Sequence, residues 1–373
     1  MIRIVPVETS RLLGKFIDFP HDLYANDSNY VPELFVGQRD MLTPGKHPFH
    51  QHAEIKLFLA YQGEDIKGRI AAIINHNHNG YTNRNDGFFG FFDAINDTAV
   101  VQALFKAATD WLKLKGLNTI NGPVNFSTND SCGVLVEGFD SPPVAMMPYN
   151  YTYYDSLIKA NGFAKKTDLM AYELNVAESN ERSLRLLETL TSRLARKGIT
   201  IRQVNLKDFK NEASKIRDVY NSAWDKNLGF VPMTTEEFEH LAKELKLIVD
   251  PRFCLVAEKD GQFIGWILGI PDINQILIKI KKGRLFPTGL FKLLTQKKNI
   301  TRIRVMTLGI LEPYRKMGIE ACLYASVIKN TFGTKVTGGE CSWMLEENYL
   351  MNHAIEQLNG KLYKKYRLYE KAI

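Results

Sequence analysis

The chain has 373 residues, of which 45% are hydrophobic and 24% charged; this is ordinary for a soluble globular protein and long enough for two domains. No apolar run is long enough to span a membrane and the first residues lack the apolar core of a signal peptide, so a cytoplasmic protein is expected. Cys132, Cys254, Cys322 and Cys341 are scattered without a C-x-x-C pair, which predicts reduced, mostly buried thiols.

The sequence repeats itself at offsets of 196 to 199 residues. Residues 2–7 (IRIVPV) resemble 201–206 (IRQVNL), and 22–24 resemble 218–220. The strand–turn–strand pattern at 59–70 resembles the pattern at 256–267, and Asn150 recurs as Asn348. Matches in the same order along the chain predict two copies of one domain.

Each copy has the pattern strand, helical segment, hairpin, strand, helix, strand, helix, strand. This predicts a mixed α/β (α+β) fold with two tandem domains, each a mixed, mostly antiparallel sheet flanked by helices. We place the N-terminal domain at 1–176, a connector helix at 177–199 and the C-terminal domain at 200–373. The connector carries a leucine stripe, which favours packing between domains. The stripe consists of Leu184, Leu187, Leu190 and Leu194.

Two polar segments of the first copy call for interpretation. His76 and His78 resemble a metal-binding pair, but no third ligand accompanies them; a polar hairpin end is favoured and no metal is expected. Residues 93–100 (DAINDTAV) place Asp93 and Asp97 before a helix, and this acidic loop is expected to repel a phosphate group.

The net charge of +7 is concentrated in one segment, because residues 273–311 contain nine basic residues and no Asp or Glu. Bulky apolar residues are mixed with these charges between Lys281 and Leu294. The composition favours an acyl-carrier protein or an anionic membrane surface as a partner at 279–304, with a solvated inserted loop as the alternative. Nucleic acid is not expected, because interleaved aromatic residues that would stack on bases are lacking.

A strand, a glycine-containing loop and a helix follow one another at 303–327. Branched residues alternate at 303–310, and inward-facing residues recur at helical spacing from Ile319 to Val327. The turn from Arg315 to Gly318 should leave backbone N–H groups free at the helix N-terminus, where a phosphate group would also meet the helix dipole.

This order, with Pro-Tyr-Arg-x-x-Gly in the loop, resembles the acyl-CoA-binding segment of the GNAT superfamily of N-acyltransferases. Arg315 and Gly318 match the family pattern, whereas Glu320 stands where a second small residue belongs. Further segments extend the resemblance to a little-characterised bacterial group of tandem GNAT proteins. These segments are 122–130, 138–143, 146–154, 227–233 and 342–348.

The resemblance implies an acyl donor, either acetyl-CoA, another acyl-CoA or an acyl-carrier thioester, bound by the C-terminal copy. The implied donor-binding residues are Thr307, Leu308, Gly309, Ile310, Arg315, Lys316, Met317, Gly318 and Ile319. Gly309 is expected to permit the strand bulge and the close approach that the family uses. The N-terminal copy would act as a scaffold and as a wall of the acceptor site. The implied acceptor-binding residues are Trp224, Asn227, Phe230, Asn125 and Ser127, with ordinary loop structure as the alternative.

The chemistry of the family requires a base for the attacking amine and benefits from an acid for the thiolate. The donor strand 305–310 has no ionisable side chain, so Glu340 on the next strand is the proposed base, with a surface carboxylate as the alternative. Asn348 and Tyr349 complete the predicted catalytic residues, although Asn348 is favoured as a helix cap. No tyrosine stands at the position of the family's general acid.

The sequence therefore predicts an acyl-CoA-dependent N-acyltransferase in which an amine attacks the thioester directly. One alternative is a long-chain N-acyltransferase that acts on a lipid-like amine, located in the cytoplasm or at the inner face of the membrane. The other is a non-catalytic protein that binds acyl-CoA or acyl-carrier protein.

Overall fold

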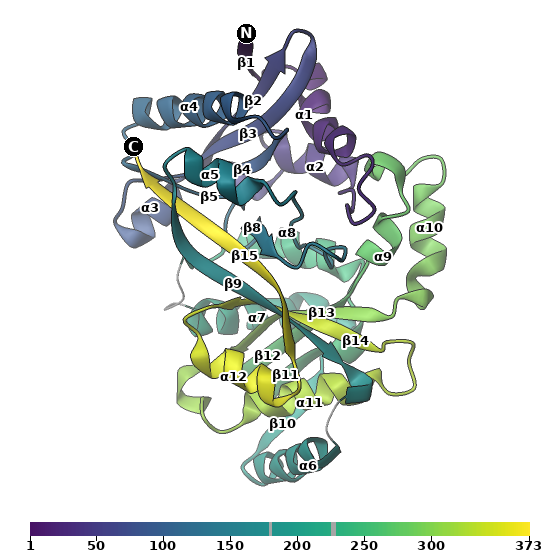
Figure 1. The fold of residues 1–373 in the computed structure, drawn as a ribbon. Helices are drawn as coiled ribbons and strands as arrows, with labels where there is room; N and C mark the ends of the chain where they lie inside the picture. Colours follow the sequence, from purple (N-terminus) through teal and green to yellow (C-terminus); the bar gives the residue numbers. More distant parts are fainter. Residues whose placement is uncertain (179–180, 225–228) are drawn as a thin grey trace. The chain divides into compact units, whose positions relative to one another are not determined.

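The computed structural model of the chain describes residues 1–178, 181–224 and 229–373, and of residues 181–187 it describes only the backbone (Figure 1). Leu184, Leu187 and Asn227 therefore lie outside the described side chains. The chain forms two compact units. The first unit comprises Met1–Leu169, Asn274–Thr295 and Lys364–Ile373, and the second comprises Met170–Ile273 and Gln296–Tyr363.

The first unit contains most elements of the N-terminal half of the chain. Its strands are β1 (Ile2–Pro6), β2 (Ala53–Gln62), β3 (Asp65–Asn75), β4 (Asp86–Ala94), β5 (Thr119–Gly122), β6 (Val124–Asn125), β7 (Ser131–Cys132), β8 (Val134–Glu137), the first half of β9 (Ala164–Asn175) and most of β15 (Lys361–Ala372). Its helices are α1 (Ser10–Leu23), α2 (Phe35–Leu42), α3 (His76–Thr82), α4 (Thr98–Leu114), α5 (Tyr154–Ala160), α9 (Asn274–Leu277) and α10 (Gly289–Gln296), the last residue of which belongs to the second unit.

The main sheet of the first unit has the strand order β1-β2-β3-β4-β5-β15, in which only the β4–β5 pair is parallel. Because successive residues of a strand face opposite sides, Leu57 and Leu59 of β2 pack with α1, whereas Phe58 and Ala60 pack with α4. The sheet thus buries both of its faces under helices.

The second unit repeats this architecture. Its strands are β10 (Ile199–Gln203), β11 (Cys254–Lys259), β12 (Gln262–Pro271), β13 (Arg302–Ile310) and β14 (Gly338–Leu345). Its helices are α6 (Glu181–Arg196), α7 (Phe209–Ala223), α8 (Thr235–Lys246), α11 (Ile319–Thr331) and α12 (Tyr349–Gln357). The strand order is β14-β13-β12-β11-β10, and again only the pair next to the helix crossover, β13–β14, is parallel.

The predicted mixed α/β fold with two similar domains is confirmed, and α11 packs on one face of the second sheet through Cys322, Leu323 and Val327. The described side chains of the connector belong to this unit, since Leu194 is in the same core and Leu190 packs against it. Of the described residues, none belongs to a helix that is long and apolar enough to cross a membrane.

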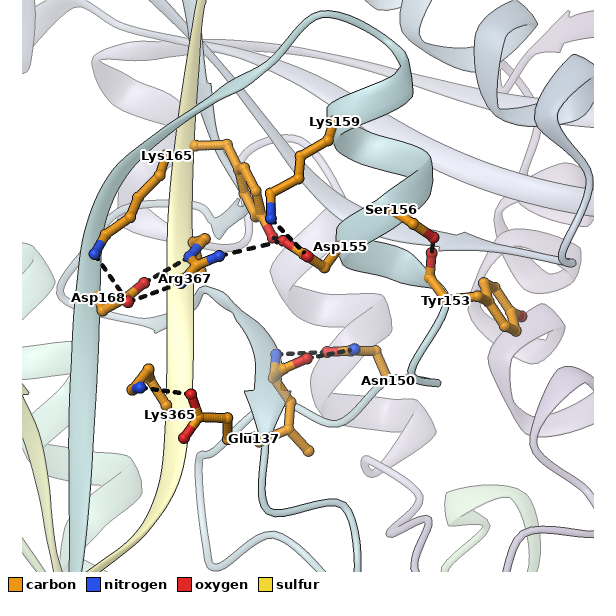
Figure 2. Close-up of polar contacts among 12 residues, drawn as sticks. Glu137, Asn150, Tyr153, Asp155, Ser156, Lys159, Lys165, Asp168, Lys365 and Arg367 are labelled. Atoms are coloured by element: carbon orange, nitrogen blue, oxygen red, sulfur yellow. Dashed lines mark hydrogen bonds and ion pairs between the residues drawn. The ribbon is translucent and has the colours of Figure 1, made fainter.

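The two units differ from the predicted division of the chain, because Asn274–Thr295 and Lys364–Ile373 belong to the first unit. Figure 2 shows how the C-terminal strand is held there: Arg367 donates to both carboxylate oxygens of Asp168 at 2.7 and 2.9 Å, and Lys365 pairs with Glu137 at 2.5 Å. Burial alone would raise the pKa of Asp168, but its hydrogen bonds with Arg367 and Lys165 outweigh burial and hold the pKa below its ordinary value. The last strand is thus an integral part of the first unit, a pairing that sequence periodicity does not reveal.

The histidine segment lies at the end of a hairpin, as expected, because α3 joins the antiparallel strands β3 and β4. His76 begins the short helix α3, and His78 is buried with its Nε2 3.2 Å from Asp86 Oδ2. Among the described residues, no group of three His, Cys, Asp or Glu side chains could hold a metal ion.

Candidate functional site

In the second unit, the parallel strands β13 and β14 are paired only between Arg302–Val305 and Gly338–Cys341. Within the described residues the two strands do not pair beyond this point, although β13 continues to Ile310 and β14 to Leu345. At the same place β13 has a bulge at Met306, because Leu268 of β12 pairs with Thr307 while Gly269 pairs with Val305. The two central strands therefore separate at the bulge and leave one edge of β13 without a strand partner.

We expected the bulge at Gly309, but it lies three residues earlier, at Met306. Gly309 instead allows a close approach of side chains, since a Cβ there would lie 3.2 Å from Ala223 Cβ, 3.3 Å from Trp266 Nε1 and 3.4 Å from Trp224 Nε1. A larger residue would push α7 and the two indole rings away from the strand.

The bulge also decides which side chains share a face of the sheet. The register with β12 places Arg304, Thr307 and Gly309 on the same face of the sheet as Trp266. The helix α11 covers the other face. Thr307 Oγ1 and Trp266 Nε1 are buried on the face away from α11, and neither makes a hydrogen bond within the described part of the chain. Two buried polar atoms without a partner next to a strand edge are what a bound polar ligand would satisfy.

The loop after β13 ends in Gly318, which precedes the first residue of α11 and has a φ of 81°. Lys316 also has a positive φ, of 64°. Of the described residues, none accepts a hydrogen bond from the backbone N–H groups of Lys316, Met317, Gly318 and Ile319. Four N–H groups at the start of a 13-residue helix form a site suited to an anion.

Arg315 and Glu320 flank these N–H groups, and their side chains have different surroundings. Arg315 donates to the backbone oxygens of Ile310 at 3.1 Å and of Ala223 at 2.8 Å, so its side chain joins the loop to the end of α7. Glu320 lies in the first turn of α11, where the helix dipole favours a negative charge, and its buried Oε2 has no hydrogen-bond partner among the described residues.

Glu340 lies on β14 directly beside Arg304 in the register, one residue before the strands part. It is completely buried, so the alternative of a surface carboxylate is wrong. The Ser342 hydroxyl donates to Glu340 Oε1, and Arg304 Nε donates to the Ser342 oxygen at 3.0 Å. The Tyr363 hydroxyl donates to Glu340 Oε2. A buried guanidinium, two hydroxyls and one carboxylate thus form a continuous hydrogen-bonded chain.

Tyr363, like Arg304 and Ser342, belongs to this hydrogen-bonded series and was not among the site residues predicted from the sequence. It lies at the start of β15, separated from Glu340 by 23 residues, and is half-buried, whereas Arg304 and Glu340 are buried. Only the pairing of distant strands brings the two together, so no sequence motif could have indicated the contact. Tyr363 is thus the partly exposed end of a hydrogen-bonded series whose other end is buried.

Cys341 faces the other side of β14, toward Tyr324 of α11. Burial, followed by the negative charge of Glu340, holds the pKa of the Cys341 thiol far above its ordinary value. A protonated, buried thiol is a poor nucleophile.

The other predicted residues of this unit that the structure describes lie outside the hydrogen-bonded series around Glu340. Asn348 caps α12, its side chain accepting from the N–H of Met351 at 3.3 Å, and Tyr349 is 77% exposed. Trp224 ends α7 and stacks on Tyr220, and the buried Phe230 contacts the same ring. Trp224 and Phe230 thus belong to an aromatic cluster beside Gly309, and their assignment to the acceptor site stays a prediction, as does that of Asn227.

In the first unit the equivalent strands part in the same way, because β4 and β5 pair only from Asp86 to Phe88 and from Thr119 to Asn121. Here the chain itself fills the gap. A Cβ on Gly90 of β4 would lie only 1.7 Å from Val124 O, and the Asn125 side chain accepts from the N–H of Phe91 at 2.7 Å. Asn125 thus seals the gap from within, and Ser127 bonds to Asp130 in the following turn.

The helix after β4 is closed as well. The Asp97 side chain accepts from the N–H groups of Ala99 at 2.8 Å and Val100 at 3.2 Å, so the N-terminus of α4 is capped by its own carboxylate. Asp93, expected in an acidic loop, is in fact a buried strand residue whose Oδ2 is 2.8 Å from Arg69 Nε. The first N–H groups of α4 are therefore occupied, unlike those at the start of α11.

Comparison with known proteins places the chain in a family. No protein-family model matches the sequence. The bacterial ceramide synthase of Caulobacter vibrioides is 35% identical over 379 residues, which cover 100% of this chain and 98% of that protein. Protein YghO of Escherichia coli K12 is 36% identical over 367 residues, covering 97% and 93%.

Solved structures agree on the fold. A tandem GNAT protein from the clavulanic acid biosynthesis pathway matches with a TM-score of 0.59 and 10% identity, covering 100% of this chain and 98% of its own. A GCN5-related N-acetyltransferase from Sphaerobacter thermophilus matches with a TM-score of 0.51 and 12% identity over 85% of this chain and 80% of its own. The chain therefore belongs to the family of bacterial proteins that includes bacterial ceramide synthase and YghO, and it has the fold of a tandem GNAT protein.

Proposed function

We propose that the protein is an N-acyltransferase that transfers a long-chain acyl group from an acyl-CoA thioester to the amine of a lipid-like amino alcohol. The observation that carries this proposal is the 35% identity, over the whole chain, to a bacterial ceramide synthase. A ceramide is the amide of a fatty acid and a long-chain amino alcohol, so a synthase of that name forms an amide bond on a lipid amine.

The geometry of the second unit supports binding of the donor there. The free N–H groups of residues 316–319 and the dipole of α11 suit the pyrophosphate of CoA. The unpaired edge of β13 offers backbone groups to the amide-containing arm, and Thr307 Oγ1 and Trp266 Nε1 are buried polar atoms that await a partner. In the first unit the equivalent gap is filled and the equivalent helix is capped, which supports a single donor site.

The Glu340 chain supports the proton transfer that the reaction needs. The amine nitrogen attacks the thioester carbon, the C–N bond forms and the C–S bond breaks, so the nitrogen loses a proton and the thiolate gains one. Glu340 is engaged on both oxygens by hydroxyl groups. Tyr363 therefore receives the proton of the amine while it passes its own proton to Glu340, and the protonated pair can return a proton to the thiolate.

The test is to incubate the purified chain with acetyl-CoA, a long-chain acyl-CoA or an acyl-carrier thioester, each with a long-chain amino alcohol or a short water-soluble amine. Thiol release and the mass of the amide product are measured. The proposal expects amide from the long-chain acyl-CoA and the long-chain amino alcohol. CoA binding by calorimetry without turnover for any pair would instead support a non-catalytic thioester-binding protein.

A matched pair of variants separates catalysis from folding. Glu340→Gln removes the buried carboxylate that we place in the proton path, whereas Glu137→Gln removes a carboxylate that pairs with Lys365 and is 59% exposed. Only the first change should abolish turnover, and both proteins should retain the thermal unfolding profile of an ordered fold.

A further inference from the structure

The acid-free segment after β12 divides into a part that is docked on the first unit and a part that is not. Arg284 donates to both oxygens of Asp18 on α1 at 2.8 Å, and its guanidinium lies 3.3 Å from the centroid of the Phe35 ring. Lys282 pairs with Asp22 of the same helix at 2.5 Å. These contacts fix residues 282–284 on α1 and α2 and account for two of the segment's cations.

Two glycines tighten this docking. Gly283 has a φ of 61°, and a Cβ there would lie 1.8 Å from Glu33 O, so its backbone is pressed against the chain before α2. Gly289, the first residue of α10, also lies close to backbone, since a Cβ there would be 2.6 Å from Arg284 O. The direction in which α10 leaves the docked turn is therefore fixed by backbone packing.

On and just before α10, several large apolar side chains are left exposed by the described part of the chain. Four large side chains between residues 286 and 294 are exposed: Phe286 at 77%, Leu290 at 39%, Phe291 at 69% and Leu294 at 68%. Leu290 and Leu294 are four residues apart and Phe291 and Leu294 are three apart, so these three side chains form one stripe on the helix. An exposed apolar stripe of this kind marks a contact surface.

The charges around the stripe indicate the class of partner. Residues 273–311 contain no acidic residue, and Lys279 and Lys281 are exposed just before Phe286, while Lys298 is exposed just after α10. Large apolar side chains with lysines before and after them in the sequence match the interface of an anionic bilayer, where the rings enter the headgroup region and the cations remain at the phosphates.

We infer that the apolar stripe of α10, with Phe286 and the flanking lysines, is a peripheral membrane-docking surface selective for anionic lipid. The inference goes beyond the proposed function, because it concerns where the protein works and not which bond it forms. It is also compatible with a lipid amine as acceptor, since docking would bring the chain to the bilayer that holds such a substrate.

The test is cosedimentation of the full chain with vesicles of phosphatidylcholine alone or with phosphatidylglycerol added. We expect binding only when phosphatidylglycerol is present, with a decrease on addition of salt. Phe291→Glu combined with Leu294→Glu should reduce partitioning by about tenfold or more, and Lys279→Glu combined with Lys281→Glu should reduce it on anionic vesicles. Leu114→Glu, at an 85% exposed leucine that ends α4, is the matched control and should change nothing.

Three results would overturn the inference: absence of binding to anionic vesicles, binding that the double change at 291 and 294 leaves unaltered, or stripe-dependent capture of acyl-carrier protein or of a second copy of the chain in place of vesicles. The vesicle assay does not depend on turnover, so it is decided separately from the proposed function. If both proposals hold, the 291/294 variant keeps its activity on a long-chain amino alcohol dissolved in detergent and loses it on the same amine embedded in vesicles.

Discussion

The buried histidine of α1 makes the stability of the first unit depend on pH. His21 is 5% exposed, its Nδ1 lies 2.9 Å from the Tyr30 hydroxyl, and its Nε2 is buried without a hydrogen-bond partner among the described residues. Burial lowers the pKa of His21 from 6.5 to about 4, and the charges of Arg69, Arg284 and Lys282 add to this effect, while Asp22 opposes it.

The sign follows from proton uptake. Below pH 6.5 the unfolded chain protonates His21, whereas the folded chain does so only near pH 4, so the unfolded state is stabilised relative to the folded state as the pH falls. Stability is thus complete above pH 6.5, decreases between pH 6.5 and about 4, and loses nothing further from this group below that. A shift from 6.5 to about 4 corresponds to about 3 kcal/mol in total, of which about 2 kcal/mol is lost by pH 5.

The assay is hydrogen exchange of peptides from α1 and α4 at pH values from 7.5 to 4, with rates corrected for intrinsic exchange. His21→Asn is the control, because the Asn amide can occupy the place of Nδ1 beside Tyr30 and does not titrate. The wild-type chain should lose protection relative to this variant between pH 6.5 and 4. Arg284→Met removes one of the cations that lower the pKa of His21, so the loss of protection at low pH should be smaller in this variant. Parallel pH profiles for the wild type and His21→Asn would refute the reasoning.

Three further predictions concern the two sheets. Glu340→Gln should lower the rate of acyl transfer by about 10²- to 10⁴-fold and Tyr363→Phe by a smaller factor, with CoA affinity by calorimetry unchanged in both, because the proposed loss is of proton transfer; equal rates for Tyr363→Phe and the wild type would remove Tyr363 from the path. Gly318→Ala should destabilise the second unit by about 1–3 kcal/mol and weaken CoA binding, since a Cβ at φ 81° would lie 2.6 Å from Leu190 Cδ2; shortening that side chain by Leu190→Ala should not restore CoA affinity. Asp97→Ala should cost about 0.5–2 kcal/mol in urea unfolding through loss of the α4 cap, yet leave CoA affinity unaltered, and a change in affinity would place a donor in the first unit.

Local sequence patterns predicted the parts of the fold that local forces determine. The change from alternating residues in 303–310 to helical spacing after Gly318 placed β13 and α11 almost to the residue, because each element must bury one face. Asn348 was favoured as a helix cap, and its side chain does accept from Met351. These features depend on neighbours within a few residues, which a single sequence displays.

Features that depend on distant segments were not predictable in this way. The Tyr363–Glu340 contact and the Arg367–Asp168 pair join strands that are adjacent only after the sheets assemble. Asp93 read as an exposed loop acid because its partner Arg69 lies 24 residues earlier on the neighbouring strand. The burial of a polar residue is the hardest feature to predict. An aspartate can lie at the surface or form a buried ion pair, and which of these occurs depends on a partner that is distant in the sequence.

The contrast between the two copies follows from a few positions on a shared framework. Both sheets part after a short parallel pairing, and both carry a bulge on the strand concerned. In the first copy the chain after β5 enters the gap, which requires Gly90 because any side chain would collide with Val124 O, and Asp97 occupies the N–H groups of the following helix. In the second copy Gly318 at positive φ starts the helix without a side-chain cap, so the equivalent N–H groups stay free. The first copy instead uses Asp18 and Asp22 of α1 to hold the turn that carries α10. The donor site that we propose thus lies in the second copy, and the first copy supports the lipid-docking surface that we propose.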